Sequence, residues 1–440
     1  MTILVRGCDY LVRNTAQVER DCDLLIEGNR IQLVGKNLQA PPGSEILEAR
    51  HCLVMPGLIN AHTHLYQNFL KGSSPGVPLV PWCNQVLFPN LDLLRAGMKK
   101  YGTRPAFLWS ALAACEMIHA GITSCVDMDA VSPGILQGWQ ATGFRGVLAY
   151  TLANKWVPEE LRASENVMKE QLLEFVAEHH RPNGLTTVFA APSALFLCTD
   201  DFLVWAGEQA RRHDLGMQIH ISEIASEVDD MLAETGHTPL EHLEHLGLLD
   251  SFFSAVHCVH LRGRDIEILS KWKCTAVHCP KSNMKLADGA APVNKMKAAG
   301  IPIALGTDGC ASNDLLDMWE EMRQAVLLAR VSTGSADALT PADAFQMATA
   351  QAARAARLEA GELLPGRLAD LVILDLQSAH LQPFNELDPI NMLVFCARAG
   401  DVRDTIINGK IVMRNRQLTM INEVDLLRES ISLKAEFAGM

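Results

Sequence analysis

Short apolar segments that end in polar residues alternate with amphipathic segments along most of this chain, and this alternation constrains the fold most strongly. The strand candidates are residues 53–62, 122–127, 146–150, 186–191, 217–220, 254–257, 275–278 and 303–308. Between them lie helical candidates such as residues 105–120, 164–178, 199–213, 239–246, 263–272 and 292–299. Strand-then-helix units repeated eight times predict an α/β fold in which a parallel sheet closes into a (β/α)8 TIM barrel.

The two ends of the chain have a different texture. Before the first unit, residues 1–6, 24–27 and 30–34 are apolar runs, and Gly28-Asn29 between two of them is a hairpin signal. Strand patterns return after about residue 361, at 369–375, 402–408 and 411–414. We therefore expect a composite β-domain from residues 1–55 and 363–440, and a catalytic barrel from residues 56–362.

Composition excludes several classes of protein. Hydrophobic residues make up 48% of the 440 residues and charged residues 20%, which suits a large packed core. The net charge of −13 opposes binding to a nucleic-acid polymer, because such binding depends on Lys and Arg. We recognise no signal peptide and no apolar run of about 18 residues. The expectation is a cytoplasmic protein without a membrane partner, whose 12 cysteines stay reduced.

Several predicted strands end in residues that bind metals or transfer protons. His62 and His64 lie two residues apart and so point to the same side of a strand. Strands five, six and eight end at His220, His257 and Asp308. In a barrel these carboxyl ends surround one mouth, where active sites form. Each histidine alone could be structural, but the shared position favours a divalent zinc, iron or manganese ion.

The motifs around these residues resemble the amidohydrolase superfamily, in the branch that contains triazine hydrolases, nucleobase deaminases and methylthioadenosine/S-adenosylhomocysteine deaminases. The similar segments are PGLINAHTH at 56–64, HISE at 220–223, VHCVH at 256–260, HCPKSN at 278–283, GTDGCASN at 306–313 and GRLADLV at 366–372. This resemblance covers essentially the whole chain. It implies a TIM barrel with a small β-sandwich domain formed from both termini, and one divalent metal, with zinc expected and iron as an alternative.

The resemblance also implies roles for individual residues. The metal ligands would be His62, His64, His220 and Asp308, with Asp308 also accepting a proton from the attacking water. Glu223 would be the proton shuttle, and His257 would polarise the water or the substrate. The end of strand four, 186–194, has no Lys or Glu that could bridge two metals, which favours a single ion.

These residue types predict hydrolytic deamination of a nitrogen heterocycle. A divalent metal lowers the pKa of water towards neutrality, and the resulting hydroxide attacks the ring carbon that carries the amino group. A proton from Glu223 to the neighbouring ring nitrogen relieves the developing charge, and ammonia leaves. The chain is thus expected to be a hydrolase acting on non-peptide C–N bonds.

Three further residues are candidates for substrate binding. Trp82 lies in a long predicted loop, 66–90, and could stack on a heteroaromatic ring or simply anchor the loop. Gln67 could hydrogen-bond a ring edge, and Ser193 follows strand four.

Two departures bear on the substrate. Related nucleoside deaminases carry a Glu at the position of Leu91 and a His in the segment at 191–194, which here reads Ala-Pro-Ser-Ala. Because this chain lacks both polar groups, the sequence predicts a substrate without ribose, that is, a bare heterocycle such as a purine, pterin, pyrimidine or s-triazine. Dehalogenation of an s-triazine and deamination of methylthioadenosine or S-adenosylhomocysteine stay open as alternatives, and a non-catalytic barrel is the rival outside enzymes.

Other residues near the motifs have simpler interpretations. Glu227, Asp229 and Asp230 are interpreted as an exposed acidic helix face near a helix N-terminus. Asn283 is expected to shape the metal site. The composition permits a homo-oligomer without indicating one.

Overall fold

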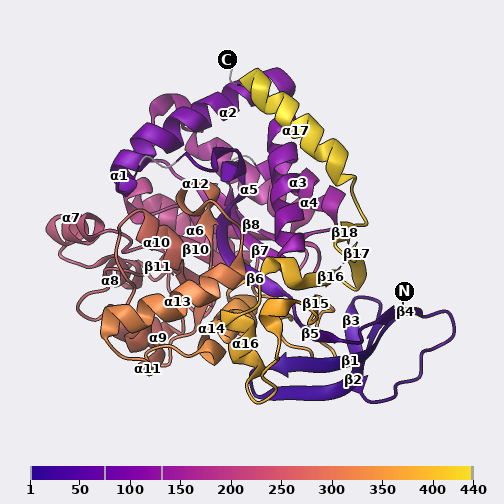
Figure 1. Ribbon diagram of the computed structural model, residues 1–440. Helices are drawn as coiled ribbons and strands as arrows, with labels where there is room; N and C mark the ends of the chain where they lie inside the picture. The colour runs from indigo at the N-terminus through magenta and orange to yellow at the C-terminus, as the bar shows by residue number, and fades with distance from the viewer. Residues whose placement is uncertain (1, 74–75, 130–131, 438–440) are drawn as a thin grey trace.

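The computed structural model describes residues 2–73, 76–129 and 132–437. Its centre is a parallel barrel that confirms the predicted fold (Figure 1). The strands are β6 (Leu58–His64), β7 (Ile122–Asp129), β8 (Arg145–Leu152), β9 (Thr186–Pro192), β10 (Met217–Ile221), β11 (Phe253–His257), β12 (Thr275–His278), β13 (Ile303–Leu305) and β14 (Asp308–Gly309). Each pairs with the next along the chain from β6 to β13, and β14 pairs with β6, so the sheet closes on itself.

Helices surround this barrel and connect its strands (Figure 1). They are α3 (Arg104–His119), α4 (Ser132–Thr142), α5 (Glu165–His179), α6 (Asp200–Arg212), α7 (Ala225–Thr235), α8 (Pro239–His245), α9 (Asp265–Trp272), α10 (Pro280–Lys285), α11 (Val293–Ala298), α12 (Cys310–Asn313), α13 (Met318–Thr333), α14 (Pro341–Ala348) and α15 (Ala350–Ala355). Short 3-10 turns follow two strands, η3 (Glu159–Leu161) after β8 and η4 (Leu195–Leu197) after β9. Buried side chains such as Ile59, Val126, Phe189 and Val256 fill the barrel together with alanines of α15.

The first predicted strand, 53–62, proved to be two strands that belong to different sheets. β5 (Cys52–Pro56) pairs with β1 (Thr2–Asn14) in the sheet formed by the termini, and the barrel strand β6 begins two residues later. Gly57 separates them, and a Cβ atom there would lie 2.2 Å from the side chain of Thr123 on β7. A glycine is required because the chain passes from one sheet to the other directly against the barrel wall.

The predicted loop at 66–90 is largely helical. It contains η1 (Leu65–Leu70), α1 (Leu79–Trp82), a π-helical turn η2 (Cys83–Leu87) and the start of α2 (Phe88–Tyr101). Ser74 and Pro75 of this segment lie outside the described residues. Apolar contacts among Leu70, Trp82, Val86 and Leu286 fold the segment over the mouth of the barrel.

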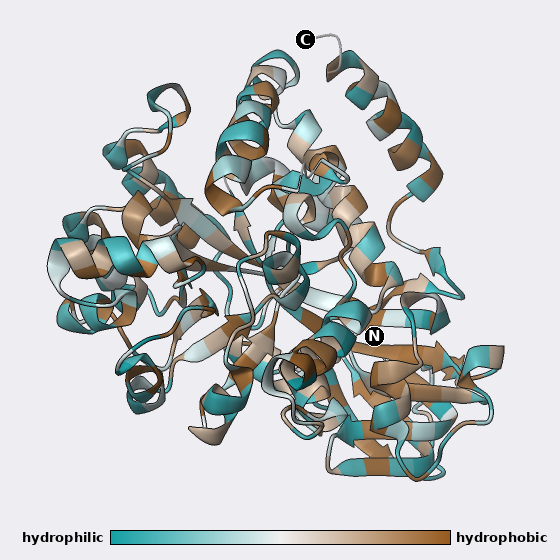
Figure 2. Ribbon diagram, turned by 60° about the vertical axis from the view of Figure 1, so that its left-hand side comes forward, coloured by the Kyte–Doolittle hydropathy of each residue, from teal (hydrophilic) through white to brown (hydrophobic). Residues whose placement is uncertain are grey.

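Both chain ends build one mixed sheet, here called the terminal sheet. Besides β1 and β5 it contains β2 (Gln17–Glu27), β3 (Arg30–Gly35), β4 (Glu45–Glu48), β15 (Leu371–Asp375), β16 (Val402–Ile407), β17 (Lys410–Arg414) and β18 (Gln417–Leu418). Its apolar side chains, among them Val5, Leu24, Val54 and Ile373, form a separate core, and in Figure 2 its strands at the lower right are mostly brown. The composite β-domain predicted from both termini is therefore present.

The remaining C-terminal elements are η5 (Ala379–Leu381), α16 (Pro389–Phe395), η6 (Ala399–Asp401) and α17 (Glu423–Phe437). Helix α17 does not join the terminal sheet, but lies along the barrel helix α3 (Figure 1). Its Phe437 ring contacts Trp109, with the ring centroids 5.1 Å apart. All 12 cysteines are free thiols. Among the residues described, no helix combines the length and the apolarity that crossing a bilayer requires.

Candidate active site

Four side chains predicted as metal ligands converge at the carboxyl ends of the barrel strands. His62 and His64 lie at the end of β6, His220 on β10, and Asp308 at the start of β14. One nitrogen or oxygen atom of each side chain can serve as a ligand, and these four atoms lie within 4.8 Å of one another. Closure of the barrel between β14 and β6 brings Asp308 beside the two histidines, although 244 residues (308 minus 64) separate Asp308 from His64 along the chain.

Hydrogen bonds on the outer nitrogens orient the three imidazoles. Nδ1 of His62 lies 2.8 Å from Oε1 of Gln218, Nδ1 of His64 lies 2.6 Å from the carbonyl of Met128, and Nδ1 of His220 lies 2.6 Å from the carbonyl of Ser193. Because each of these partners accepts a hydrogen bond, Nδ1 of each ring carries the proton. Nε2 is then unprotonated and can donate its lone pair to a metal ion. All three Nε2 atoms therefore direct a lone pair towards the centre of the cluster.

The distances between these inner atoms fit a shared cation. His62 Nε2 lies 3.1 Å from His220 Nε2, and Asp308 Oδ1 lies 3.5 Å and 3.4 Å from Nε2 of His62 and His64. Two lone pairs so close repel each other unless a positive charge lies between them. Tetrahedral ligands with bonds of about 2.0–2.1 Å are separated by about 3.3–3.4 Å. The donor set and its spacing thus fit one divalent metal ion.

Asp308 is held as a carboxylate with one oxygen facing the histidines. Its Oδ2 accepts hydrogen bonds from Ser282 Oγ at 2.5 Å and Ser312 Oγ at 2.9 Å, and its Oδ1 accepts from the Gly309 N–H at 2.7 Å. Burial opposes its charge, but the surrounding imidazoles hold the pKa of Asp308 well below its usual value. Its φ of +61° lies in the left-handed region, which costs free energy and is typical of functional positions.

Glu223 and His257 lie beside the ligand cluster as a second pair. Glu223 Oε1 is 3.5 Å from His257 Nε2, and the two groups converge with Asp308. Burial and the nearby carboxylates of Asp288 and Asp308 raise the pKa of Glu223 well above its usual value, which favours its protonated form. Burial lowers the pKa of His257 to about 4, and its Nδ1 lies 2.8 Å from Oδ1 of Asn283. The sequence predicts that Asn283 shapes the metal site, and in the structure its side chain orients His257.

Gln67, Trp82 and Ser193 all line the catalytic pocket above the ligand cluster, together with Tyr66 and Leu286. Gln67 accepts a hydrogen bond from the Ala311 N–H at 3.3 Å, which directs its amide towards α12. Trp82 is buried in the apolar cluster under α1 as well as lining the pocket. Ser193 contributes its carbonyl to His220. Each of the three therefore also has a structural contact, and their contacts with substrate remain predictions.

Several residues that shape this site were missed by sequence reasoning. Gln218 orients His62, and its position two residues before His220 on the same strand is a signal that could have found it. The two serines on Asp308 left no such periodic signal. The interpretation of Glu227 as exposed was wrong: it is buried and accepts hydrogen bonds from the N–H groups of Ser222 and Glu223, both at 2.9 Å. Its side chain turns inward because these amides at the end of β10 need an acceptor.

Comparison with known proteins agrees with this geometry. Residues 53–412 match the amidohydrolase family. A 5-methylthioadenosine/S-adenosylhomocysteine deaminase from Pyrococcus horikoshii is 34% identical over 424 residues, which cover 96% of this chain and 97% of that protein. The crystal structure of a zinc-bound adenosine deaminase from Xanthomonas campestris superposes with a TM-score of 0.91 at 28% identity, covering 100% of this chain and 99% of that one.

A zinc-bound atrazine chlorohydrolase from Arthrobacter aurescens is similar in fold, with a TM-score of 0.92 at 22% identity over 98% of this chain and 99% of that one. The family match spans all the barrel strands and the C-terminal strands β15 and β16 of the terminal sheet, and the aligned relative covers nearly the whole chain. This chain belongs to the amidohydrolase family and is a hydrolase that acts on carbon–nitrogen bonds.

Proposed function

We propose that this protein hydrolytically removes the 6-amino group of an adenine nucleoside or a closely related heterocycle, with one zinc ion in the His62–His64–His220–Asp308 site. The observation that carries the proposal is Glu223, a buried carboxyl group with a raised pKa that lies beside this ligand set. A general acid in that position suits an amino leaving group, because ammonia departs only after the ring and the nitrogen have been protonated.

His62, His64, His220 and Asp308 would hold the zinc ion, which would supply a water molecule acidic enough to act as a nucleophile near neutral pH. Asp308 Oδ1 faces this position and accepts the proton, while the hydroxyls of Ser282 and Ser312 keep its other oxygen turned away. His257, whose Nδ1 is held by Asn283, presents an unprotonated Nε2 that would accept a hydrogen bond from the attacking water and polarise it. Glu223 would give its proton to the ring nitrogen next to the reacting carbon, and the proton held by Asp308 would complete the departing ammonia. As the carbon–nitrogen bond breaks and the carbonyl forms, the proton left on the added oxygen would return to Glu223.

The size of the pocket bears on the substrate. The catalytic pocket shares Tyr66, Phe88 and Ser193 with a neighbouring cavity that is lined by Leu91 and Tyr150. There is thus room next to the ring site for a substituent, and relatives similar along the whole chain are named as nucleoside deaminases. Leu91 offers this substituent an apolar contact in place of a charge, which supports nucleosides whose recognition does not depend on ribose hydroxyls.

The second candidate is the bare heterocycle that the sequence predicts from Leu91 and from the segment around Ser193. One assay separates the candidates: ammonia release by the zinc-loaded protein from 5′-methylthioadenosine, adenosine, adenine, guanine and an amino-s-triazine, with chloride release from a chloro-s-triazine measured in parallel. We expect the nucleosides to have the highest kcat/KM. Release of ammonia from free bases alone would establish the second candidate, and release of chloride alone would refute deamination.

A further inference from the structure

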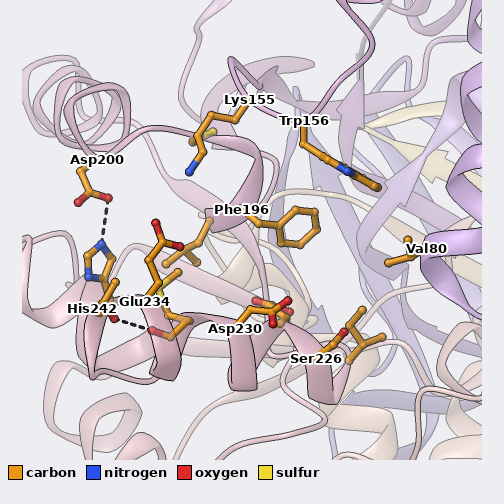
Figure 3. Close-up of a pocket in the computed structure, with 15 residues that line it drawn as sticks. Val80, Lys155, Trp156, Phe196, Asp200, Ser226, Asp230, Glu234 and His242 are labelled. Carbon is orange, nitrogen blue, oxygen red and sulfur yellow. Dashed lines mark hydrogen bonds and ion pairs between the residues drawn. The ribbon is translucent and has the colours of Figure 1, made fainter.

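A second cavity, here called the outer cavity, adjoins the catalytic pocket and has a different chemical character. Trp156 and Phe196 line both, so a ligand at the reacting centre can extend from one into the other. In Figure 3 these two rings lie on one side of the outer cavity, and Asp230, Glu234 and Asp200 lie around the rest of it, with Lys155 above. Its walls therefore combine aromatic faces with carboxylates.

The aromatic wall consists of the exposed ring of Trp156 and the half-buried ring of Phe196. The Trp156 and Phe196 centroids lie 5.6 Å apart at an interplanar angle of 76°, so that the two rings form a corner. Trp156 is 43% exposed, an unusual position for an indole, and its φ of +54° holds the backbone in the left-handed region. Exposed aromatic faces set at an angle are suited to cations, which are attracted by the ring quadrupole.

More acidic than basic side chains line the outer cavity. Asp230 and Glu234 lie one turn apart on α7 and both line the cavity, and Asp200 accepts a hydrogen bond from His242 at 2.9 Å. Within the described part of the chain, neither Asp230 nor Glu234 forms an ion pair, and Lys155 is the one Lys or Arg among the lining residues. By contrast the adjacent Asp229 pairs with Arg262 at 2.5 Å and does not line the cavity.

A buried carboxylate provides independent support. Asp288 lies in a smaller cavity that shares Val80, Ile224 and Ser226 with the outer cavity. It is 7% exposed, and across the described ranges neither of its oxygens has a hydrogen-bond partner. An unsatisfied carboxylate at this depth is costly, and a cationic group of a ligand would relieve that cost.

We propose that the outer cavity binds an ammonium group on the substituent of the substrate, so that the preferred substrate is an aminated heterocycle or adenine nucleoside with a positively charged tail. This inference rests on the proposed function and narrows its substrate class. The ring occupies the site near Glu223, the tail passes Trp156 and Phe196, and Asp230 and Glu234 face the charged end.

Two nucleosides of equal length test the proposal: 5′-deoxy-5′-(3-aminopropylthio)adenosine, which carries the charge, and its neutral 5′-butylthio counterpart. Cation–π contact and two partly exposed charge pairs predict that kcat/KM is about tenfold higher for the ammonium compound. In the double variant Asp230→Asn/Glu234→Gln this preference should fall to about twofold or less, while kcat/KM for the neutral compound is unchanged. Asp229→Asn, which removes a carboxylate from the same helix outside the cavity, should keep the full preference.

Equal kcat/KM for both compounds in the unmodified enzyme, or a preference that survives the double substitution, overturns the inference and leaves the proposed deamination intact. A higher kcat/KM for S-adenosylhomocysteine, whose tail carries a carboxylate as well as an ammonium group, than for the ammonium compound also overturns the inference. Lys155 would then dominate recognition of the tail. If the zinc-loaded enzyme releases ammonia neither from these nucleosides nor from the free bases, the proposed function fails. Calorimetric titration of the two compounds into the enzyme and the double variant then still decides whether the outer cavity recognises the cation.

Discussion

The two ends of the barrel both bury charged groups, but they balance them differently. At the amino ends of the strands, Arg145 and Asp370 form a completely buried pair with contacts of 2.6 and 3.1 Å. The remaining donors of Arg145 reach the carbonyls of Asn183 and Gly184 and the side chain of Asn408, and the Asn408 N–H donates to Asp370 at 2.6 Å. The charges of Arg145 and Asp370 therefore balance each other, and their hydrogen bonds are formed without any ligand.

At the carboxyl ends the buried polar groups do not balance. Three imidazole lone pairs face each other, and Glu223 and Asp288 lie near Asp308 with too few donors between them. The first cluster joins the barrel to the terminal sheet and stabilises the fold. The second needs a metal ion and a substrate to complete it, and this incompleteness distinguishes a functional cluster from a structural one. The following predictions test that difference.

Metal removal should have the largest effect. A chelator should abolish ammonia release, and added zinc should restore it, because among the residues that the structure describes no group replaces the cation between His62 and His220. The unfolding temperature should fall as well, since a ligand that binds only the folded state stabilises it by about 2.7 kcal/mol at 100 times its Kd. Elemental analysis, calorimetry and the activity assay check this. Full activity in protein shown to be metal-free would contradict it.

Glu223→Gln should lower kcat/KM by about 10²- to 10⁴-fold, because the amide keeps the shape but carries no transferable proton. Because the raised pKa of Glu223 favours its protonated form, the activity of the unmodified enzyme should decline as the pH rises through this pKa and the proton donor is lost. Metal content and unfolding temperature should be unchanged in the variant. A variant with normal activity would remove Glu223 from the mechanism.

Asp370→Asn should lower the free energy of unfolding by about 3–5 kcal/mol, because it leaves the buried Arg145 charge uncompensated. The activity of the protein that remains folded should change little, since this pair lies at the opposite end of the barrel from Glu223. Glu386→Gln, which removes the partner of exposed Arg20, is the matched control and should cost at most about 1 kcal/mol. Equal losses in the two variants, measured by denaturant unfolding, would contradict the comparison.

Gln218→Leu should have the smallest effect, a loss of about 10- to 100-fold in metal affinity. Gln218 is not one of the four predicted ligands. Its Oε1 accepts a hydrogen bond from Nδ1 of His62, and its Nε2 donates one to the carbonyl of Ala61 at 3.0 Å. Competition with a chromogenic chelator measures the affinity. At saturating zinc, most of the activity should return, and its absence would mean that Gln218 has a further role.

Much of the fold and of the candidate site could be predicted from the chain because their signals are local. The alternation of strands and helices is read within windows of a few residues, and all eight predicted barrel strands are present, with the first shorter than predicted and the last interrupted after Leu305. The two-residue spacing of His62 and His64 predicts that they point to the same side of a strand. The positions of His220, His257 and Asp308 at strand ends predict that they lie at the mouth of the barrel.

Other features of the site depend on which residues meet across the barrel. Glu227 looked exposed from its acidic neighbours, yet it turns inward to the amides after β10. The serines on Asp308 come from α10 and α12. The outer cavity combines Trp156 and Phe196 with carboxylates of α7, and the closeness of Asp288 to Glu223 follows from packing. The sequence by itself determined the barrel and the kinds of ligand, because periodicity and strand ends are local properties. Only the tertiary structure decided which buried groups remain unbalanced, because their partners are separated by up to hundreds of residues and meet only when the barrel closes.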